Sequence, residues 1–209
     1  MLPPSFYAQP TLVVARALVG KLLVHDAAEG RAVGRIVEVE AYIGESDPAC
    51  HAAAGRTARN APLYGPPGHA YVYLNYGLHL LLNAVTEADG WPAAVLLRAL
   101  APVEGESLMR RRRSGTSTSR HPAYALCRGP GNLGRAMGIT MAANRGSLTR
   151  GPLTIEDDGA PAVDVVWTPR IGVSLGADRY WRCAARHDRA VSGLRRWLTE
   201  GRLAPAPKR

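Results

Sequence analysis

The stretch GRIVEVEAY, residues 34–42, carries the clearest strand signal of the chain, because its side chains alternate with a period of two. Glu38, Glu40 and Tyr42 share one face of this strand. Glu40 and Tyr42 project the same way, about 6.6–6.8 Å apart along the strand. A carboxylate beside an aromatic ring suits a base that activates water next to a planar substrate. The alternative, which such alternation favours on its own, is an edge strand whose solvated face bears two ordinary glutamates.

The segments on either side of this strand predict a mixture of strands and helices. The predicted helices cover Thr11–Leu18, with Thr11 as cap and Gly20 as stop, Pro102–Arg113, Gly131–Met137 and Ala190–Leu198. The predicted strands cover Lys21–His25, Ala70–Tyr76, Leu78–Thr86, Ala93–Leu100, Pro152–Asp158, Ala162–Val166 and Ile171–Leu175, and Ser114–Arg120 is a predicted loop. Hairpin-like strands among scattered helices indicate one α+β domain, not a βαβ series. We expect this domain to span residues 1–204 and residues 205–209 to form a frayed tail.

A second constellation lies on the predicted hairpin that reverses at residues 75–77. Tyr71, Tyr73 and Asn75 share one face of its first strand, and Tyr76 stands at the turn. Tyrosines on a strand can stack on bases, and an aromatic residue at a hairpin tip can wedge into a base step. The alternative is ordinary β-propensity and core packing. That alternative explains Tyr71 and Tyr73 more easily than it explains Tyr76.

Polar residues also interrupt two apolar strands, as Asn83 does in residues 80–85 and Arg98 in residues 95–100. A buried arginine is costly unless it meets a carboxylate or reaches water. Structural pairing is the more frequent explanation, although pairing with a catalytic glutamate would produce the same pattern. His51 follows Cys50, but no CxxC or HxxxH spacing accompanies them, so we expect an exposed loop histidine, no metal and no cofactor.

Composition and charge narrow the class of partner. The chain has 209 residues and a net charge of +9, which suits one soluble globular domain. Three scattered cysteines indicate a reducing compartment, and no signal peptide or membrane anchor is recognisable. Residues 1–105 carry a balance of −2 and residues 106–209 a balance of +11, which favours a polyanionic partner. Lys21 and Lys208 are the two lysines, so a Schiff-base nucleophile is disfavoured.

Taken together, these segments resemble the alkyladenine DNA glycosylase (3-methyladenine DNA glycosylase) family. The resemblance runs in order over nearly the whole chain. The matching segments are ARALVGKLLV (15–24), RIVEVEAYIGESDPACH (35–51), GRTARNAPLYGPPGHAYVYLNYGLH (55–79), LLRALAPVEG (96–105), GPGNLGRAMGI (129–139) and RIGVS (170–174). It implies a single mixed α+β domain with a curved antiparallel sheet, a protruding β-hairpin and surrounding helices.

The resemblance also implies a function and a set of site residues. Family members flip alkylated or deaminated purines out of duplex DNA and hydrolyse the N-glycosidic bond, a monofunctional reaction that initiates base excision repair. It implies a monomer bound to double-stranded DNA with damaged purines. We expect no membrane contact and, because no targeting signal is recognisable, a place in a bacterial cytoplasm at the nucleoid. The implied residues are Glu40 as general base, Arg98 and the Val173 carbonyl near the water, Tyr42, His51 and Tyr73 as pocket walls, Asn83 against the guanine 2-amino group, Tyr76 as inserted residue and Arg59 as DNA contact.

Three segments depart from the family pattern. Asn132 in GPGNL stands where the family usually has lysine, the HAAAG stretch after His51 lacks larger or basic residues, and WRCAARHDRAVSG (181–193) lacks the usual aromatic residues after WR. Two other functions remain open on the residues alone. One is a non-catalytic nucleic-acid-binding module with salt-sensitive binding. The other is a carbohydrate hydrolase that uses Glu38 and Glu40.

Overall fold

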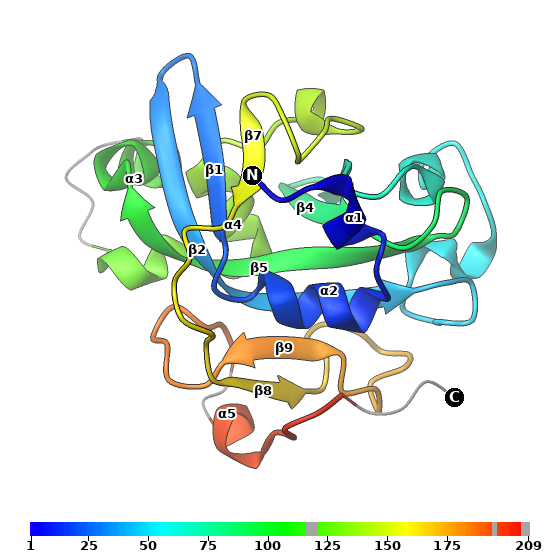
Figure 1. Ribbon diagram of the computed structural model, residues 1–209. Coiled ribbons are helices and arrows are strands. Elements are labelled where there is room, and N and C mark those ends of the chain that lie inside the picture. Colours follow the sequence, from blue (N-terminus) through cyan, green and yellow to red (C-terminus); the bar gives the residue numbers. More distant parts are fainter. Residues whose placement is uncertain (116–120, 194–195, 206–209) are drawn as a thin grey trace.

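The computed structural model describes residues 1–115, 121–193 and 196–205. Within these ranges, one antiparallel sheet of nine strands is surrounded by five α-helices (Figure 1). The strands are β1 (Leu22–Ala27), β2 (Gly30–Ile43), β3 (Ala70–Asn75), β4 (His79–Val85), β5 (Ala93–Glu104), β6 (Cys127–Arg128), β7 (Leu153–Glu156), β8 (Val165–Thr168) and β9 (Arg182–Ala185). The helices are α1 (Pro4–Tyr7), α2 (Thr11–Leu18), α3 (Glu106–Ser114), α4 (Pro130–Met137) and α5 (Arg196–Glu200). The expected single α+β domain is confirmed.

The strand that carries GRIVEVEAY lies at the centre of the sheet. In the order β3-β4-β5-β2-β1-β7, β2 has β5 on one side and β1 on the other. Past the end of β1, β9 continues the ladder opposite residues 38–40 of β2. β2 is therefore no edge strand, and the side chains of Glu38 and Glu40 are fully buried. The reading of this segment as a solvated edge strand is therefore wrong.

Apolar residues of the helices and of the sheet form one main core. Helix α2 packs on β2 and β5 and contributes Val14, Ala15 and Leu18. Its bounds are those expected, but Pro10 stands at the cap position, and the Thr11 hydroxyl bonds the side chains of Thr86 and Glu87 instead. Thr11 therefore ties the helix to the loop after β4, and its assignment as a capping residue is wrong.

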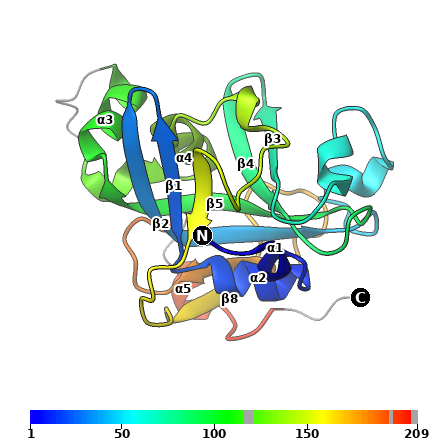
Figure 2. The same cartoon turned by 45° about the horizontal axis from the view of Figure 1, so that its top comes forward.

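The predicted hairpin of β3 and β4 is confirmed. Its register runs from Ala70 opposite Ala84 to Asn75 opposite His79. Figure 2 shows this hairpin rising from the long β2–β5 ribbon on the same side as the β1–β2 hairpin. The tip, residues 76–78, is thus displayed away from the main body of the sheet, as the protruding hairpin was expected to be.

Two other predictions of secondary structure are wrong, and the strand predicted at Ala162–Val166 lies further along the chain, at Val165–Thr168. Residues 102–104 do not open a helix but prolong β5, where Pro102 lies opposite Gly34 and Glu104 opposite Val33. The segment Ile171–Leu175 forms bends and no strand. The strand β9 was not predicted from the sequence. The last helix was expected to begin at Ala190 but begins at Arg196.

Parts of three expectations lie outside the described residues. Residues 116–120 belong to the predicted serine- and threonine-rich loop, residues 194–195 to the predicted last helix, and residues 206–209 to the predicted tail. Among the described helices, none combines the length and the apolar character needed to cross a bilayer.

Candidate active site

The carboxylate of Glu40 is buried in β2 and held by three hydrogen-bond donors. The Tyr42 hydroxyl and the Arg98 Nη1 both donate to Oε2, at 2.8 and 3.0 Å. The backbone N–H of Ile171 donates to Oε1 at 2.7 Å. A carboxylate offers about four acceptor positions, so Oε1 keeps one for a further donor such as water. The predicted pairing of Glu40 with Tyr42 on one face is confirmed.

Irregular strand pairing brings Arg98 to this carboxylate. Between β2 and β5, the register passes from Ile36 opposite Leu100 to Glu38 opposite Ala99, and then to Val39 opposite Leu97. Val37 on one strand and Arg98 on the other are the extra residues. Such bulges re-aim side chains. Here Arg98 reaches both glutamates, donating from Nε to Glu38 and from Nη1 to Glu40, so the expected carboxylate partner of this buried arginine is confirmed.

A cavity of about 160 Å³ lies beside Tyr42. Four aromatic rings, those of Tyr42, His51, Tyr71 and Tyr73, form part of its wall. Its lining consists of Tyr42, Ala49, Cys50, His51, Leu63, Tyr71, Tyr73, Asn75, Asn83, Ala94, Gly172 and Val173.

The aromatic wall of the cavity is held by contacts among its own rings. The His51 Nδ1 and the Tyr71 hydroxyl share a hydrogen bond of 2.8 Å, and the His51 ring meets the Tyr73 ring edge-on at 4.4 Å between centroids. Burial, and then the positive charge of Arg59, lower the pKa of His51, which favours the neutral imidazole. Burial raises the pKa of Tyr73 to about 12, so its ring stays uncharged.

Asn83 and Val173 complete the cavity from two further elements. The buried Asn83 amide, on β4, donates to the Tyr71 carbonyl at 3.0 Å and lines the cavity. Val173 lines it from the segment that follows Ile171. The structure thus brings Tyr42, His51, Tyr73, Asn83 and Val173 together around one cavity, next to the Glu40–Arg98 pair.

Arg170 and Asp47 are site residues that the sequence analysis missed. The Arg170 guanidinium lies 4.7 Å from the Tyr42 ring centroid and forms a double hydrogen bond with Asp47, at 2.6 and 2.8 Å. It also donates to the Ala41 carbonyl at 3.0 Å. Both side chains of the pair are fully buried. The pair fixes the backbone just before Ile171 against β2, and the arginine in RIGVS was the signal that could have found it.

The remaining predicted residues, Tyr76 and Arg59, lie outside the cavity. Tyr76 is 88% exposed at the hairpin tip, with a φ of 48° in the left-handed region, which side chains rarely adopt. Gly77 follows with a φ of 69°, so both turn residues have the positive φ values of a tight hairpin turn. The exposed Arg59 donates to the Leu74 carbonyl at 3.2 Å and lines a surface groove together with Tyr76.

Glu38 does not behave as a second catalytic carboxylate. Its carboxylate already accepts four hydrogen bonds, from Arg98, from Arg182 and from both the hydroxyl and the backbone N–H of Ser192, so no acceptor position is left for a water. This argues against a carbohydrate hydrolase that uses Glu38 and Glu40 as its catalytic pair. Over the ranges that the structure describes, no group of three histidine, cysteine or acidic side chains is arranged to hold a metal ion.

Comparisons with known proteins agree on one family. The sequence profile described as "Methylpurine-DNA glycosylase (MPG)" matches residues 5–189. A protein of Methanocella arvoryzae named "Putative 3-methyladenine DNA glycosylase" is 47% identical over 195 residues, which cover 92% of this chain and 96% of its own. Proteins with the same name from Burkholderia lata and Chlorobium phaeobacteroides are each 44% identical, and they cover 92% and 90% of this chain and 91% and 94% of their own.

Proposed function

Because the chain belongs to the methylpurine-DNA glycosylase family, we propose that it flips alkylated or deaminated purines out of duplex DNA and hydrolyses their N-glycosidic bond with an activated water. Family membership makes it a 3-methyladenine DNA glycosylase, a DNA N-glycosylase that acts in base excision repair of alkylated purines. The proposal concerns the steps of that reaction and the residues that perform them.

The observation that carries the mechanism is the buried Glu40 carboxylate with one acceptor position left beside an aromatic cavity. A water bound at Oε1 attacks C1′ of the sugar and gives its proton to Glu40. The bond from C1′ to the purine nitrogen breaks, and its electron pair leaves with the purine. The sugar passes through an oxocarbenium-like state, whose positive charge the nearby carboxylate stabilises.

Arg98 and the segment after Arg170 hold the carboxylate of Glu40, the proposed general base, in place. Arg98 and the Tyr42 hydroxyl occupy Oε2, which leaves Oε1 for the water. The Ile171 N–H binds Oε1 from the segment that also carries Val173 into the cavity lining. We assign the Val173 carbonyl as the second acceptor that orients the water, because a water with two acceptors presents its lone pair in a fixed direction.

The cavity is proposed to receive the extruded base. Tyr42, His51 and Tyr73 offer ring faces and edges to a flat purine. A purine alkylated at N3 or N7 is cationic, so contact with an electron-rich ring contributes about 0.5–2 kcal/mol. Asn83 is placed to crowd a 2-amino group and so to disfavour normal guanine. Extrusion itself costs a few kcal/mol and is easiest for weakly paired lesions.

Contacts outside the cavity are proposed to engage the duplex. Tyr76, exposed on the rigid hairpin, fills the space that the flipped base leaves, and Arg59 contacts the DNA beside it. The proposed partner is double-stranded DNA with damaged purines, bound by a monomer in which residues 1–204 act as one glycosylase domain. The proposed place of action is the bacterial nucleoid in the cytoplasm.

The nature of the products tests this function directly. Lys21 lies in an ion pair with Asp157 at 2.7 Å, away from the cavity, which supports water as the nucleophile. Methylated duplex DNA incubated with the protein should release free purine and leave a strand that breaks only after alkali treatment. Borohydride should trap no protein–DNA adduct. Salt-sensitive binding without free purine would indicate a non-catalytic module, and a trapped adduct would replace water by an amine nucleophile.

A further inference from the structure

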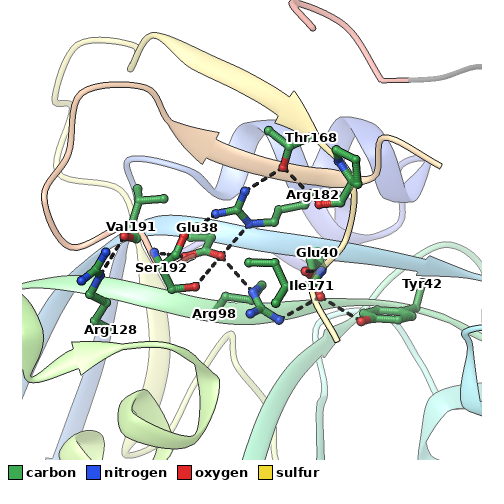
Figure 3. Close-up of polar contacts among 11 residues, drawn as sticks. Glu38, Glu40, Tyr42, Arg98, Arg128, Thr168, Ile171, Arg182, Val191 and Ser192 are labelled. Atoms are coloured by element: carbon green, nitrogen blue, oxygen red, sulfur yellow. Dashed lines mark hydrogen bonds and ion pairs between the residues drawn. The ribbon is translucent and has the colours of Figure 1, made fainter. Parts of the chain in front are cut away.

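Glu38, two residues before the proposed general base Glu40, accepts four hydrogen bonds although it does not line the cavity. Its Oε1 accepts hydrogen bonds from the Arg98 Nε at 2.9 Å, the Arg182 Nε at 2.7 Å and the Ser192 hydroxyl at 2.9 Å. Its Oε2 accepts the Ser192 backbone N–H at 2.6 Å. Figure 3 shows these groups converging on Glu38 from β5, β9 and the segment after β9.

The same contacts tie the C-terminal part of the chain to the site. Arg182 also donates from Nη1 to the Thr168 hydroxyl and from Nη2 to the Ser192 carbonyl, both at 2.7 Å. Arg128 donates to the neighbouring Val191 carbonyl at 2.9 Å (Figure 3). Arg182 and Ser192 both belong to the segment WRCAARHDRAVSG, residues 181–193. That segment therefore has a defined contact with the strand that carries the proposed base.

Charges in this cluster balance, and Arg98 is shared between the two carboxylates. Two glutamates and two arginines lie together, with exposed side-chain fractions between 0% and 8%. Burial raises the pKa of Glu38, but the charges of Arg182 and Arg98 outweigh it and lower that pKa overall. Burial lowers the pKa of Arg98, but Glu40 and Glu38 outweigh it and raise that pKa overall. Both shifts favour the charged forms of Glu38 and Arg98.

We propose that Glu38, with Arg182 and Ser192, is a positioning residue of base excision that fixes Arg98 so that its guanidinium contacts only one oxygen of Glu40. This inference rests on the proposed function, in which Glu40 Oε1 binds the attacking water. It deepens that function by assigning a role to a carboxylate that does not touch the cavity.

The geometry of the guanidinium explains why Glu38 is needed. An arginine fork pairs readily with both oxygens of one carboxylate. With its Nε bound to Glu38, the Arg98 guanidinium presents Nη1 alone to Oε2 of Glu40. Without Glu38, the fork is free to turn and bind both Glu40 oxygens, which takes the acceptor position that the water needs. The cluster would also gain one positive charge close to a sugar that itself becomes positive.

The test is Glu38→Met, which removes both acceptor oxygens at a similar side-chain length, with binding and chemistry measured separately on a duplex that contains one hypoxanthine. We expect the single-turnover excision rate to fall about 10²-fold, the size of effect that a misplaced catalytic group produces. The Kd for the same duplex should stay at the wild-type value, because Glu38 does not line the cavity. Asp158→Leu is the control, since it removes both acceptors of a double hydrogen bond to Arg35, which lies on β2 like Glu38, and should leave the rate unchanged.

A double-mutant cycle shows whether Glu38 acts through Arg98. In an Arg98→Gln background, Glu38→Met should cause no further loss of rate. An equal loss in both backgrounds, a wild-type rate, or an effect confined to Kd would each overturn the proposal. If Glu38→Met alone does not fold, the charge-balanced pair Glu38→Met/Arg182→Met decides, because it too removes every Glu38 acceptor that holds Arg98 and should be as slow. Release of free purine by the wild-type protein tests the proposed function independently of these variants. A failure of that function can therefore be told apart from a failure of the role proposed for Glu38.

Discussion

The Tyr42 hydroxyl and the Arg98 guanidinium share one oxygen of Glu40, while a single backbone N–H binds the other. Each hydrogen bond to a charged group contributes about 1.5–3 kcal/mol, so these donors together hold the carboxylate in one rotamer. The two oxygens are therefore not equivalent. Oε2 is the anchored atom, and Oε1 is the atom that can accept a proton from water.

Tyr76 combines exposure with an unfavourable backbone conformation. Its left-handed φ costs about 1–2 kcal/mol for a residue with a Cβ, and no packing in the described chain offsets this for a side chain that is 88% exposed. Tyr76→Gly should therefore leave the free energy of unfolding unchanged or higher in a urea titration. It should raise the Kd for a duplex with a damaged purine about fivefold or more, because a stacking contact contributes about 1–3 kcal/mol. Unchanged single-turnover rates and Kd would remove the wedge role.

The partners of some site residues could be predicted from the sequence, and those of others could not. Arg98 could be predicted to meet a carboxylate, because burial of an unpaired arginine is too costly. Glu38 was ambiguous, since alternation along a strand does not say whether another strand covers it. The partners that cover it, Arg182 and Ser192, lie 144 and 154 positions away in the chain, so only the folded sheet brings them together.

Helix α4 lies so close to β4 that one of its positions must be glycine. A Cβ added at Gly134 would stand 2.2 Å from the Leu80 carbonyl oxygen, which is backbone and cannot turn aside. Gly134→Ala should therefore destabilise the protein by about 1–3 kcal/mol, although alanine favours helix. Gly131→Ala is the matched control on the same helix, because its new Cβ would meet the His79 side chain, which can move. Equal unfolding free energies for the two variants would contradict this account of the packing.

At the scale of elements, prediction succeeded where local signals decide. Gly138 ends α4 in the left-handed region, and the hairpin turn lies at Tyr76–Gly77, as expected. The strand predicted at Ile171–Leu175 failed because the Ile171 N–H bonds Glu40 and not a neighbouring strand. The helix expected from Pro102 failed because strand pairing with β2 extends to Glu104. Both errors come from long-range partners that override local preference.

Over the whole molecule, the charge difference between the two halves of the chain matches their roles only in part. All residues that line the cavity, apart from Gly172 and Val173, come from the near-neutral first half of the chain. The second half also supplies Arg170, Arg182 and Ser192, which hold the site together from inside. Not every positive charge of that half is therefore available for phosphate contacts.

Exposed arginines near the hairpin should set the salt dependence of DNA binding. Arg59 lines the groove beside Tyr76 and has no carboxylate partner among the described residues. Arg59→Gln should weaken binding to damaged and undamaged duplexes alike and reduce the slope of log K against log salt by about 0.9. Arg31→Gln serves as control, because Arg31 is already paired with Asp26 and Glu104. A slope equal to that of the wild-type protein would exclude a phosphate contact at Arg59.

Single-turnover excision by Glu40→Gln tests the central claim most directly. The substrate is a duplex with one hypoxanthine, and Glu104→Gln makes the same chemical change at an exposed carboxylate of β5. We predict that Glu40→Gln binds the duplex as the wild-type protein does and releases its base about 10²–10⁴-fold more slowly, as expected on loss of a general base. Glu104→Gln should match the wild-type rate. Base release by Glu40→Gln at the wild-type rate would contradict the mechanism.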